Sequence, residues 1–150
     1  NNLLDWTLLQ MDKLSLQPAK ISLQNIVSEN LQLLSSAQNK NINFENLIPE
    51  NALAFADSNT INLVIRNLIT NAIKFTNENG QIQLSASDEG NFWKVAVKDN
   101  GVGIRKDVLN MLFDKTSPYS TRGTANEKGT GLGLILCKEF VEKNGGTISV

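Results

Sequence analysis

The sequence NLITNAIKFT, residues 67–76, closes the strongest helical pattern in the chain, which runs over residues 58–75. Its apolar members recur every three or four residues, as one buried face requires: Ile61, Ile65, Leu68, Ala72 and Phe75. Asn67, Asn71 and Lys74 share a neighbouring stripe, spaced by four and then three. One isolated Asn is best explained by a bond to nearby backbone, because an unpartnered buried amide costs roughly 1–3 kcal/mol. Two in register with a Lys favour a polar site, and an Asn oxygen suits Mg²⁺.

Two alternating segments follow, over residues 81–87 and 92–99, and the turn sequence of residues 88–91 between them predicts a β-hairpin. Asp99 is in phase with the apolar residues of the second strand, so we expect its carboxylate on the buried side. There it needs a donor, and a protonated acid or a helix N-cap is one explanation. The segment Asn100-Gly101-Val102-Gly103, suited to close approach of backbone, favours a ligand amino group instead.

The glycine-rich segment GTGLGL, residues 129–134, opens a helix predicted over residues 132–143. Free N–H groups at a helix N-terminus bind phosphate. The glycine spacing and the residues that follow match neither a Walker loop nor a dinucleotide fingerprint. The preceding stretch, residues 114–128, is polar and aperiodic, which is typical of a mobile loop. Three cations suggest that it closes over phosphates as a lid, although each alone is equally well explained as a solvated charge: Lys115, Arg122 and Lys128.

The rest of the chain predicts helices and strands in a two-layer arrangement. Helices are expected over residues 2–14, with Leu4, Leu8 and Met11 on one face, over 22–40 from a Ser22 cap, and over 107–113. Short strands are expected over residues 42–47, 52–56 and 147–150. The predicted class is α+β, a two-layer α/β sandwich with helices on one face of a mixed, mainly antiparallel sheet.

Composition limits the function further. The 150 residues suit one domain, and 41% hydrophobic and 19% charged residues with a net charge of -1 predict no contact with nucleic acid or membrane. The lone Cys137 excludes an internal disulfide, fits a cytoplasmic setting and is expected in the core. The chain contains no histidine, so any imidazole chemistry must come from elsewhere.

Four motifs in order resemble the boxes of sensor histidine kinases. NLITNAIKFT (67–76) resembles the N box, DNGVGI (99–104) the G1 box, MLF (111–113) the F box and GTGLGL (129–134) the G2 box. These kinases share the Bergerat nucleotide fold with gyrase, the ninety-kilodalton heat-shock chaperones and mismatch-repair ATPases. The opening NNLLDWTLLQMDKL resembles the end of the dimerisation and phosphoacceptor helix, which assigns residues 1–14 to that helix and linker and 15–150 to the catalytic ATP-binding domain.

The resemblance implies ATP and Mg²⁺ as ligands and gives roles to individual residues. Asp99 would accept a hydrogen bond from the adenine amino group, and Asn71 would ligate Mg²⁺. Asn67 would support the metal–phosphate arrangement, and Lys74 would reach phosphate. The hinge glycines, the lid anchor, the lid cations and the G2 segment would complete the nucleotide site: Gly101, Gly103, Phe113, Arg122, Lys128, Gly129, Thr130, Gly131, Leu132 and Gly133.

Asn67 also separates kinase from ATPase. The ATP-hydrolysing relatives place a general-base Glu at this position, and an amide cannot take a proton from water. We therefore expect phosphoryl transfer to a histidine, with an energy-transducing ATPase as the alternative and a non-catalytic binding module as a third hypothesis. Lacking histidine, the chain is expected to bind ATP without phosphorylating itself. The implied partners are a phosphoacceptor domain, a response regulator receiver domain and a second copy forming a homodimer. A membrane anchor in the full-length protein is compatible with the resemblance.

Overall fold

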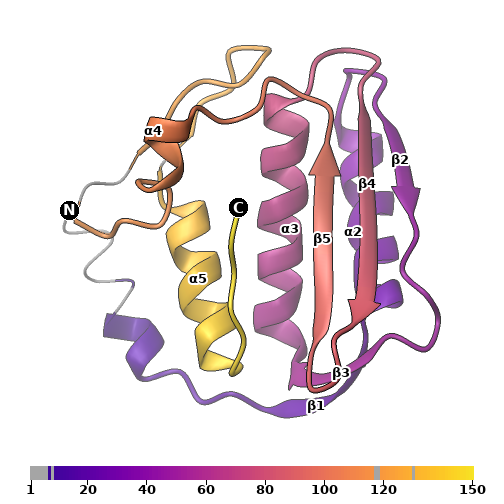
Figure 1. Cartoon of the computed structure of the whole chain (residues 1–150), viewed down its shortest axis with the longest axis vertical. Helices are drawn as coiled ribbons and strands as arrows, with labels where there is room; N and C mark the ends of the chain where they lie inside the picture. The colour runs from indigo at the N-terminus through magenta and orange to yellow at the C-terminus, as the bar shows by residue number, and fades with distance from the viewer. Residues whose placement is uncertain (1–6, 8, 117–118, 130) are drawn as a thin grey trace.

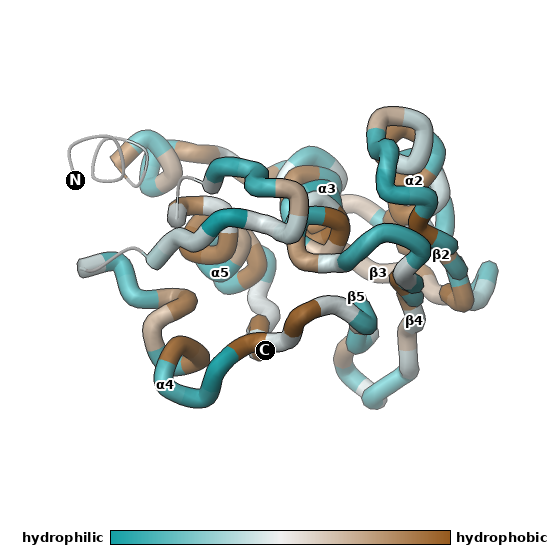
Figure 2. The backbone as a smooth tube through the Cα atoms, turned by 90° about the horizontal axis from the view of Figure 1, so that it is seen from above, coloured by the Kyte–Doolittle hydropathy of each residue, from teal (hydrophilic) through white to brown (hydrophobic). Residues whose placement is uncertain are grey.

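The computed structural model describes residues 7, 9–116, 119–129 and 131–150. Its elements, in chain order, are β1 (Pro18–Ser22), α2 (Leu23–Ala37), β2 (Asn43–Asn46), β3 (Leu53–Asp57), α3 (Ser58–Phe75), β4 (Gln81–Asp88), β5 (Trp93–Asp99), α4 (Lys106–Leu109) and α5 (Gly133–Lys143). Helices α2 and α3 lie side by side over one face of strands β4 and β5, and α5 packs beside α3 (Figures 1 and 2). The predicted two-layer α/β architecture is confirmed.

The strands form two ladders rather than one continuous sheet. One has the order β2-β4-β5 and the other pairs β1 with β3. β2 runs parallel to β4, whereas β4–β5 and β1–β3 are antiparallel, so the mainly antiparallel character is as predicted. The ladders separate after β2, where a turn closed by the Ala52 N–H donating to the Pro49 carbonyl (3.1 Å) redirects the chain.

Helix α3 has the predicted bounds, but its buried arc is wider than the predicted stripe. Val64 and Ile69 are buried, while Leu68 and Phe75 of the predicted face are only half-buried. The reason is that α3 packs against α2 on one side and α5 on the other, so two arcs of one helix are covered. Cys137 of α5 is fully buried beside this helix, with its Sγ 3.9 Å from the Val64 carbonyl oxygen, which confirms it as a core residue.

Other differences from the sequence predictions concern two whole strands and the ends of several elements. Strand β1 was not predicted. Helix α2 stops at Ala37, and α4 is a single turn followed by turn residues 110–113, so both predicted helices are too long. No strand is assigned to residues 147–150. Near the start, residues 9–12 are helical with Met11 buried, whereas Leu4, Trp6 and Leu8 lie outside the described residues. Within the described ranges, no helix combines the length and apolarity needed to cross a membrane.

Asp57 fixes the N-terminus of α3. Its carboxylate accepts hydrogen bonds from the Thr60 N–H (2.8 Å) and the Gln17 N–H (3.2 Å), and its own N–H donates to Asn144 Oδ1 (2.8 Å) just beyond α5. The Thr60 N–H, chiefly, holds the pKa of the Asp57 carboxyl below its ordinary value. One cap therefore ties the linker before β1, α3 and the end of α5 together.

Replacing Asp57 with Ala should lower the free energy of unfolding by about 1–2 kcal/mol, since the N-cap acceptor is lost. Because the folded pKa lies below the unfolded one, the carboxylate's contribution is complete above the ordinary Asp pKa. It is lost as the pH falls through the folded pKa. Urea denaturation across this acid range measures both effects. Asp57→Asn, which keeps an acceptor oxygen, should retain most of the stability but lose this pH dependence; an identical pH profile for wild type and Asp57→Asn would contradict the assignment.

Candidate functional site

The C-terminus of α3 is where the candidate site residues meet. The last carbonyls of a helix have no partners within it and must find donors elsewhere. Here three separate segments donate to the carbonyls of residues 73–75. The donors are Lys40 Nζ (2.8 Å to Ile73 O and 3.1 Å to Lys74 O), the Val102 N–H (3.1 Å to Phe75 O) and the Thr124 N–H (2.9 Å to Lys74 O). The α2–β2 connection, the G1 segment and the loop before the G2 segment thus converge on one helix end.

The two N-box asparagines are half-buried on α3, as their shared stripe predicts. Asn67 faces α5, and its Oδ1 lies 3.4 Å from the position a Cβ on Gly133 would take. It also contacts Cys137: burial raises the pKa of that thiol to about 12, and the hydrogen bond with Asn67 opposes the rise. Asn71, by contrast, has no hydrogen-bond partner for its side chain among the described residues. The amide is not among the buried unpaired groups, so it is accessible to solvent and to a ligand.

Lys74 joins the N box to the G2 segment. Its Nζ lies 5.0 Å from the centroid of the Phe75 ring. A Cβ on Gly129 would collide with this Nζ and would lie 2.9 Å from Ser120 Oγ. The structure therefore brings the predicted phosphate-binding lysine against the first glycine of the G2 segment, although the two are far apart in sequence.

Asp99 is exposed, so the prediction of a buried carboxylate is wrong. It is the last residue of β5, opposite Ile82 of β4, where the chain leaves the strand for the G1 turn. Its Oδ1 accepts the Gly101 N–H (2.9 Å). A Cβ on Gly101 would collide with the Phe75 carbonyl, so this turn passes against the end of α3 in a way that only glycine permits.

The remaining predicted positions lie between the end of β5 and the start of α5. Gly103 and Gly131 adopt positive φ of 73° and 77°, and Gly133 is the first residue of α5. Phe113 is half-buried after α4 and Leu132 is buried before α5. Thr130 lies outside the described residues.

The predicted lid is bound to the helices near both of its ends, by Lys115 at its start and by the hydrogen bond from Thr124 to α3 towards its end. At its start, Lys115 forms an ion pair with Glu139 of α5, which holds the pKa of Lys115 above its ordinary value. Further along, Arg122 Nη1 donates to the Asn126 carbonyl (3.2 Å), within the lid itself, and Lys128 is exposed. Of the three cations, Lys115 is thus engaged by the body, while contact of Arg122 and Lys128 with phosphate stays a prediction.

Several residues that build the site could not be identified from the sequence. Lys40 follows a helix in a polar stretch without periodicity, and Thr124 and Glu127 lie in the aperiodic loop. Asn100 was singled out as part of the G1 segment, but its partner was not: its Oδ1 accepts the Gln81 N–H (2.8 Å) and its N–H donates back to Gln81 O (3.2 Å), which anchors the G1 turn to β4. Only the folded chain shows these partners, because each pair joins distant segments.

The order and positions of these motifs match a known family. A family model described as histidine kinase-, DNA gyrase B-, and HSP90-like ATPase matches residues 56–150. The chain belongs to this ATPase family. Its match begins at the end of β3 and includes α3, the hairpin, the lid and α5, which are the elements that form the candidate site.

Relatives within the family are histidine kinases. A sensor-like histidine kinase of Rhizobium meliloti (strain 1021) is 43% identical over 82 residues, covering 55% of this chain and 16% of that protein. A nucleotide-free structure of the catalytic domain of histidine kinase ThkA aligns with a TM-score of 0.76 at 30% identity, covering 89% of this chain and 88% of that one. ThkA in complex with the response regulator protein TrrA aligns with the same TM-score at 26% identity, covering 99% and 42%. The chain thus spans a small part of its full-length relative and nearly all of a kinase catalytic domain.

Gly101→Ala should lower the free energy of unfolding by about 2–3 kcal/mol, because the new methyl overpacks against the Phe75 carbonyl. Gly90→Asn is the control: Gly90 has φ of 88° in open space at the hairpin turn, and Asn adopts positive φ with a cost below about 1 kcal/mol. Chemical denaturation compares the two. Equal losses would show that the G1 turn does not press on the end of α3.

Proposed function

We propose that this chain is the catalytic domain of a sensor histidine kinase, which binds ATP–Mg²⁺ and transfers the γ-phosphate to a histidine outside these 150 residues. One observation carries the proposal: the G1 turn, the lid and the N-box side chains converge on the C-terminus of α3. An adenine acceptor, a candidate metal ligand and phosphate-binding groups then lie around one helix end.

The adenine side of the site is Asp99 and the turn that follows it. The Gly101 N–H binds one carboxylate oxygen and orients the group, and the carboxylate is exposed toward a ligand. An exposed, oriented carboxylate accepts an amino group strongly, since hydrogen bonds to charged acceptors exceed neutral ones. Gly101 and Gly103 would let a planar ring approach the backbone here.

The phosphate side combines Asn71, Lys74 and the start of α5. Among the described residues, no cluster of three His, Cys, Asp or Glu side chains is placed to hold a metal. Mg²⁺ keeps several waters, binds phosphate oxygens and needs few protein ligands. The Asn71 side-chain oxygen would be one of these ligands. The bound ion would neutralise phosphate charge during transfer. Lys74, with Arg122 and Lys128 of the lid, would add positive charge, and the glycine N–H groups before α5 would bind the triphosphate.

The kinase reading rests on Asn67. Its amide packs against the start of α5 at the position where hydrolysing relatives carry a general base, and it cannot activate water. A neutral imidazole is already a competent nucleophile, so transfer to histidine needs positioning and charge stabilisation more than a base. Because the chain has no histidine, the acceptor belongs to another segment or chain.

The assignment as a kinase catalytic domain also predicts the neighbouring domains and partners. Residues 1–14 would end the phosphoacceptor helix, and residues 15–150 would form the catalytic domain. The phosphorylated histidine would then serve a response regulator receiver domain, in keeping with the complex of ThkA with TrrA. A homodimer with its catalytic domains on the cytoplasmic side is the assembly that we infer for the full-length protein.

Titration with a non-hydrolysable ATP analogue, with and without Mg²⁺, tests the nucleotide site. Asp99→Asn should weaken binding about 10- to 100-fold under both conditions, because a charged acceptor of the adenine amino group is lost. Asn71→Ala should keep the metal-free affinity and lose the gain that Mg²⁺ provides. Isothermal titration calorimetry measures both.

The chain offers matched controls. Asp88 ends β4 and accepts the Gly90 N–H at 2.9 Å, the same contact that Asp99 makes with Gly101, but at the far end of the hairpin. Asn59 is exposed in the first turn of α3. Asp88→Asn and Asn59→Ala should bind like wild type. Unchanged affinity in Asp99→Asn would refute the assigned adenine site.

A further inference from the structure

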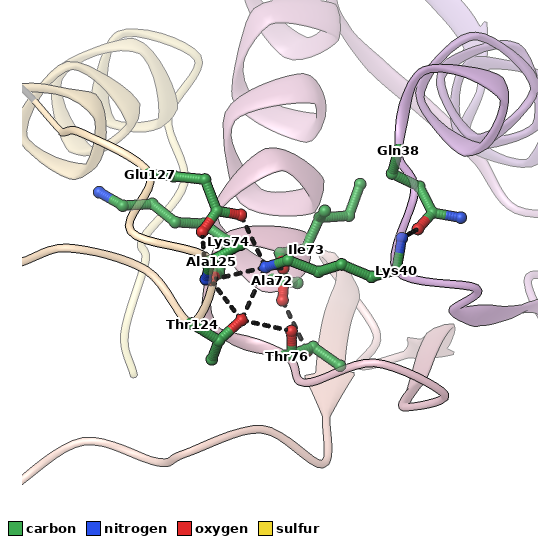
Figure 3. Close-up of polar contacts among 9 residues, drawn as sticks. All are labelled: Gln38, Lys40, Ala72, Ile73, Lys74, Thr76, Thr124, Ala125 and Glu127. Atoms are coloured by element: carbon green, nitrogen blue, oxygen red, sulfur yellow. Dashed lines mark hydrogen bonds and ion pairs between the residues drawn. The ribbon is translucent and has the colours of Figure 1, made fainter.

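Lys40 is a buried lysine in the connection between α2 and β2, and its side chain reaches across to the end of α3 and to the lid (Figure 3). The residue is only 5% exposed. Besides the carbonyls of Ile73 and Lys74, its Nζ contacts Thr124 Oγ1 at 2.7 Å and forms an ion pair with Glu127 Oε2 at 2.6 Å. An ammonium has three N–H groups, so these four acceptors fully occupy it.

The burial of this cation is explained by what surrounds it. A buried charge is unfavourable unless opposite charge and hydrogen-bond partners offset its lost hydration. The C-terminus of α3 supplies partial negative charge, and Glu127 supplies a carboxylate. Partial burial by itself would raise the pKa of Glu127, but the hydrogen bond from Lys40 and the N–H groups of Glu127 and Ala125 outweigh it, so the pKa lies below its ordinary value. Glu127 therefore presents a charged carboxylate to Lys40 at neutral pH.

Glu127 organises one turn of the lid, residues 123–127. Its Oε1 accepts the Ala125 N–H (2.8 Å), and its carbonyl accepts the Gly123 N–H (3.0 Å). Thr124, in the same turn, donates its N–H to Lys74 O (2.9 Å) and its hydroxyl to Thr76 O (2.9 Å). Lys40 is the only charged side chain in this set of contacts that comes from outside the lid, and it joins the turn to the helix end (Figure 3).

The turn leads directly to the phosphate side of the site. Gly129 follows Glu127 by two residues and lies against Lys74 Nζ. The backbone between them is too short to let the turn move away while Gly129 stays in place. The position of the turn therefore sets how the G2 segment meets the predicted phosphate-binding lysine.

We propose that Lys40 is a positioning residue for the triphosphate half of the nucleotide site. Through its ion pair with Glu127, the Lys40–Glu127 latch, it holds the lid turn on the C-terminus of α3 and so sets Gly129 beside Lys74. The effect of the latch on triphosphate affinity rests on the proposed nucleotide binding. The latch itself exists in the chain without ligand.

Glu127→Gln tests the latch, because the amide keeps the size of the side chain and an acceptor for Ala125 while removing the charge. Hydrogen exchange at the amides of Gly123, Thr124 and Ala125 should become faster, with exchange in the β4–β5 hairpin unchanged. Affinity for a non-hydrolysable ATP analogue with Mg²⁺ should fall about tenfold, while affinity for AMP, which lacks the β- and γ-phosphates, should stay within about twofold.

Lys40→Met and the double variant Lys40→Met/Glu127→Gln complete the cycle. The double variant should lose no more analogue affinity than the worse single variant, because both remove one interaction. Glu50→Gln and Lys94→Met, which neutralise exposed residues outside the latch, are the matched controls and should behave like wild type. If Lys40→Met fails to fold, Glu127→Gln alone still decides.

Unchanged exchange at the lid turn in Glu127→Gln would overturn the proposal. So would equal losses of AMP and analogue affinity, since a general loss of stability affects both ligands alike. If wild type binds no nucleotide at all, the proposed function fails, and the exchange measurement still tells whether the latch exists.

Discussion

The carbonyl groups at the C-terminus of α3 are the constraint on which the rest of the site depends. A helix that ends in the interior leaves carbonyls that must be paired. Here they are paired by a buried ammonium from Lys40 and by the N–H groups of Val102 and Thr124. Pairing the carbonyl groups of one helix end thus fixes three segments that are far apart in the sequence. The negative end of the helix dipole favours a cation among the donors.

The other end of α3 and the two ends of the lid complete this arrangement. Asp57 and Asn144 bind the start of α3 to the end of α5, so the helix pair that bears Asn67 and Gly133 is held at a fixed spacing. Lys115–Glu139 and Lys40–Glu127 hold the two arms of the lid to α5 and α3 respectively. The anchored elements therefore carry the groups that would bind nucleotide.

Most of the fold could be predicted because it is periodic. The bounds of α3 and the strands of the hairpin were predicted from the local spacing of apolar residues. The spacing of the glycines identified the G1 and G2 segments. Burial was harder to predict: Asp99 has the phase of a buried residue but is exposed as the last residue of β5. Lys40 and Glu127 were missed because neither has local periodicity, and their pairing depends on the tertiary structure.

Transfer of labelled phosphate is the decisive test of the proposed histidine kinase activity. The chain would be incubated with γ-labelled ATP, Mg²⁺ and a separate segment of the full-length protein that carries the acceptor histidine. If the chain is a histidine kinase domain, label should appear on that segment and none on the chain. Little free phosphate should form, since Asn67 cannot activate water. Rapid release of phosphate without transfer, abolished in Asn71→Ala, would contradict it and assign the site to ATP hydrolysis.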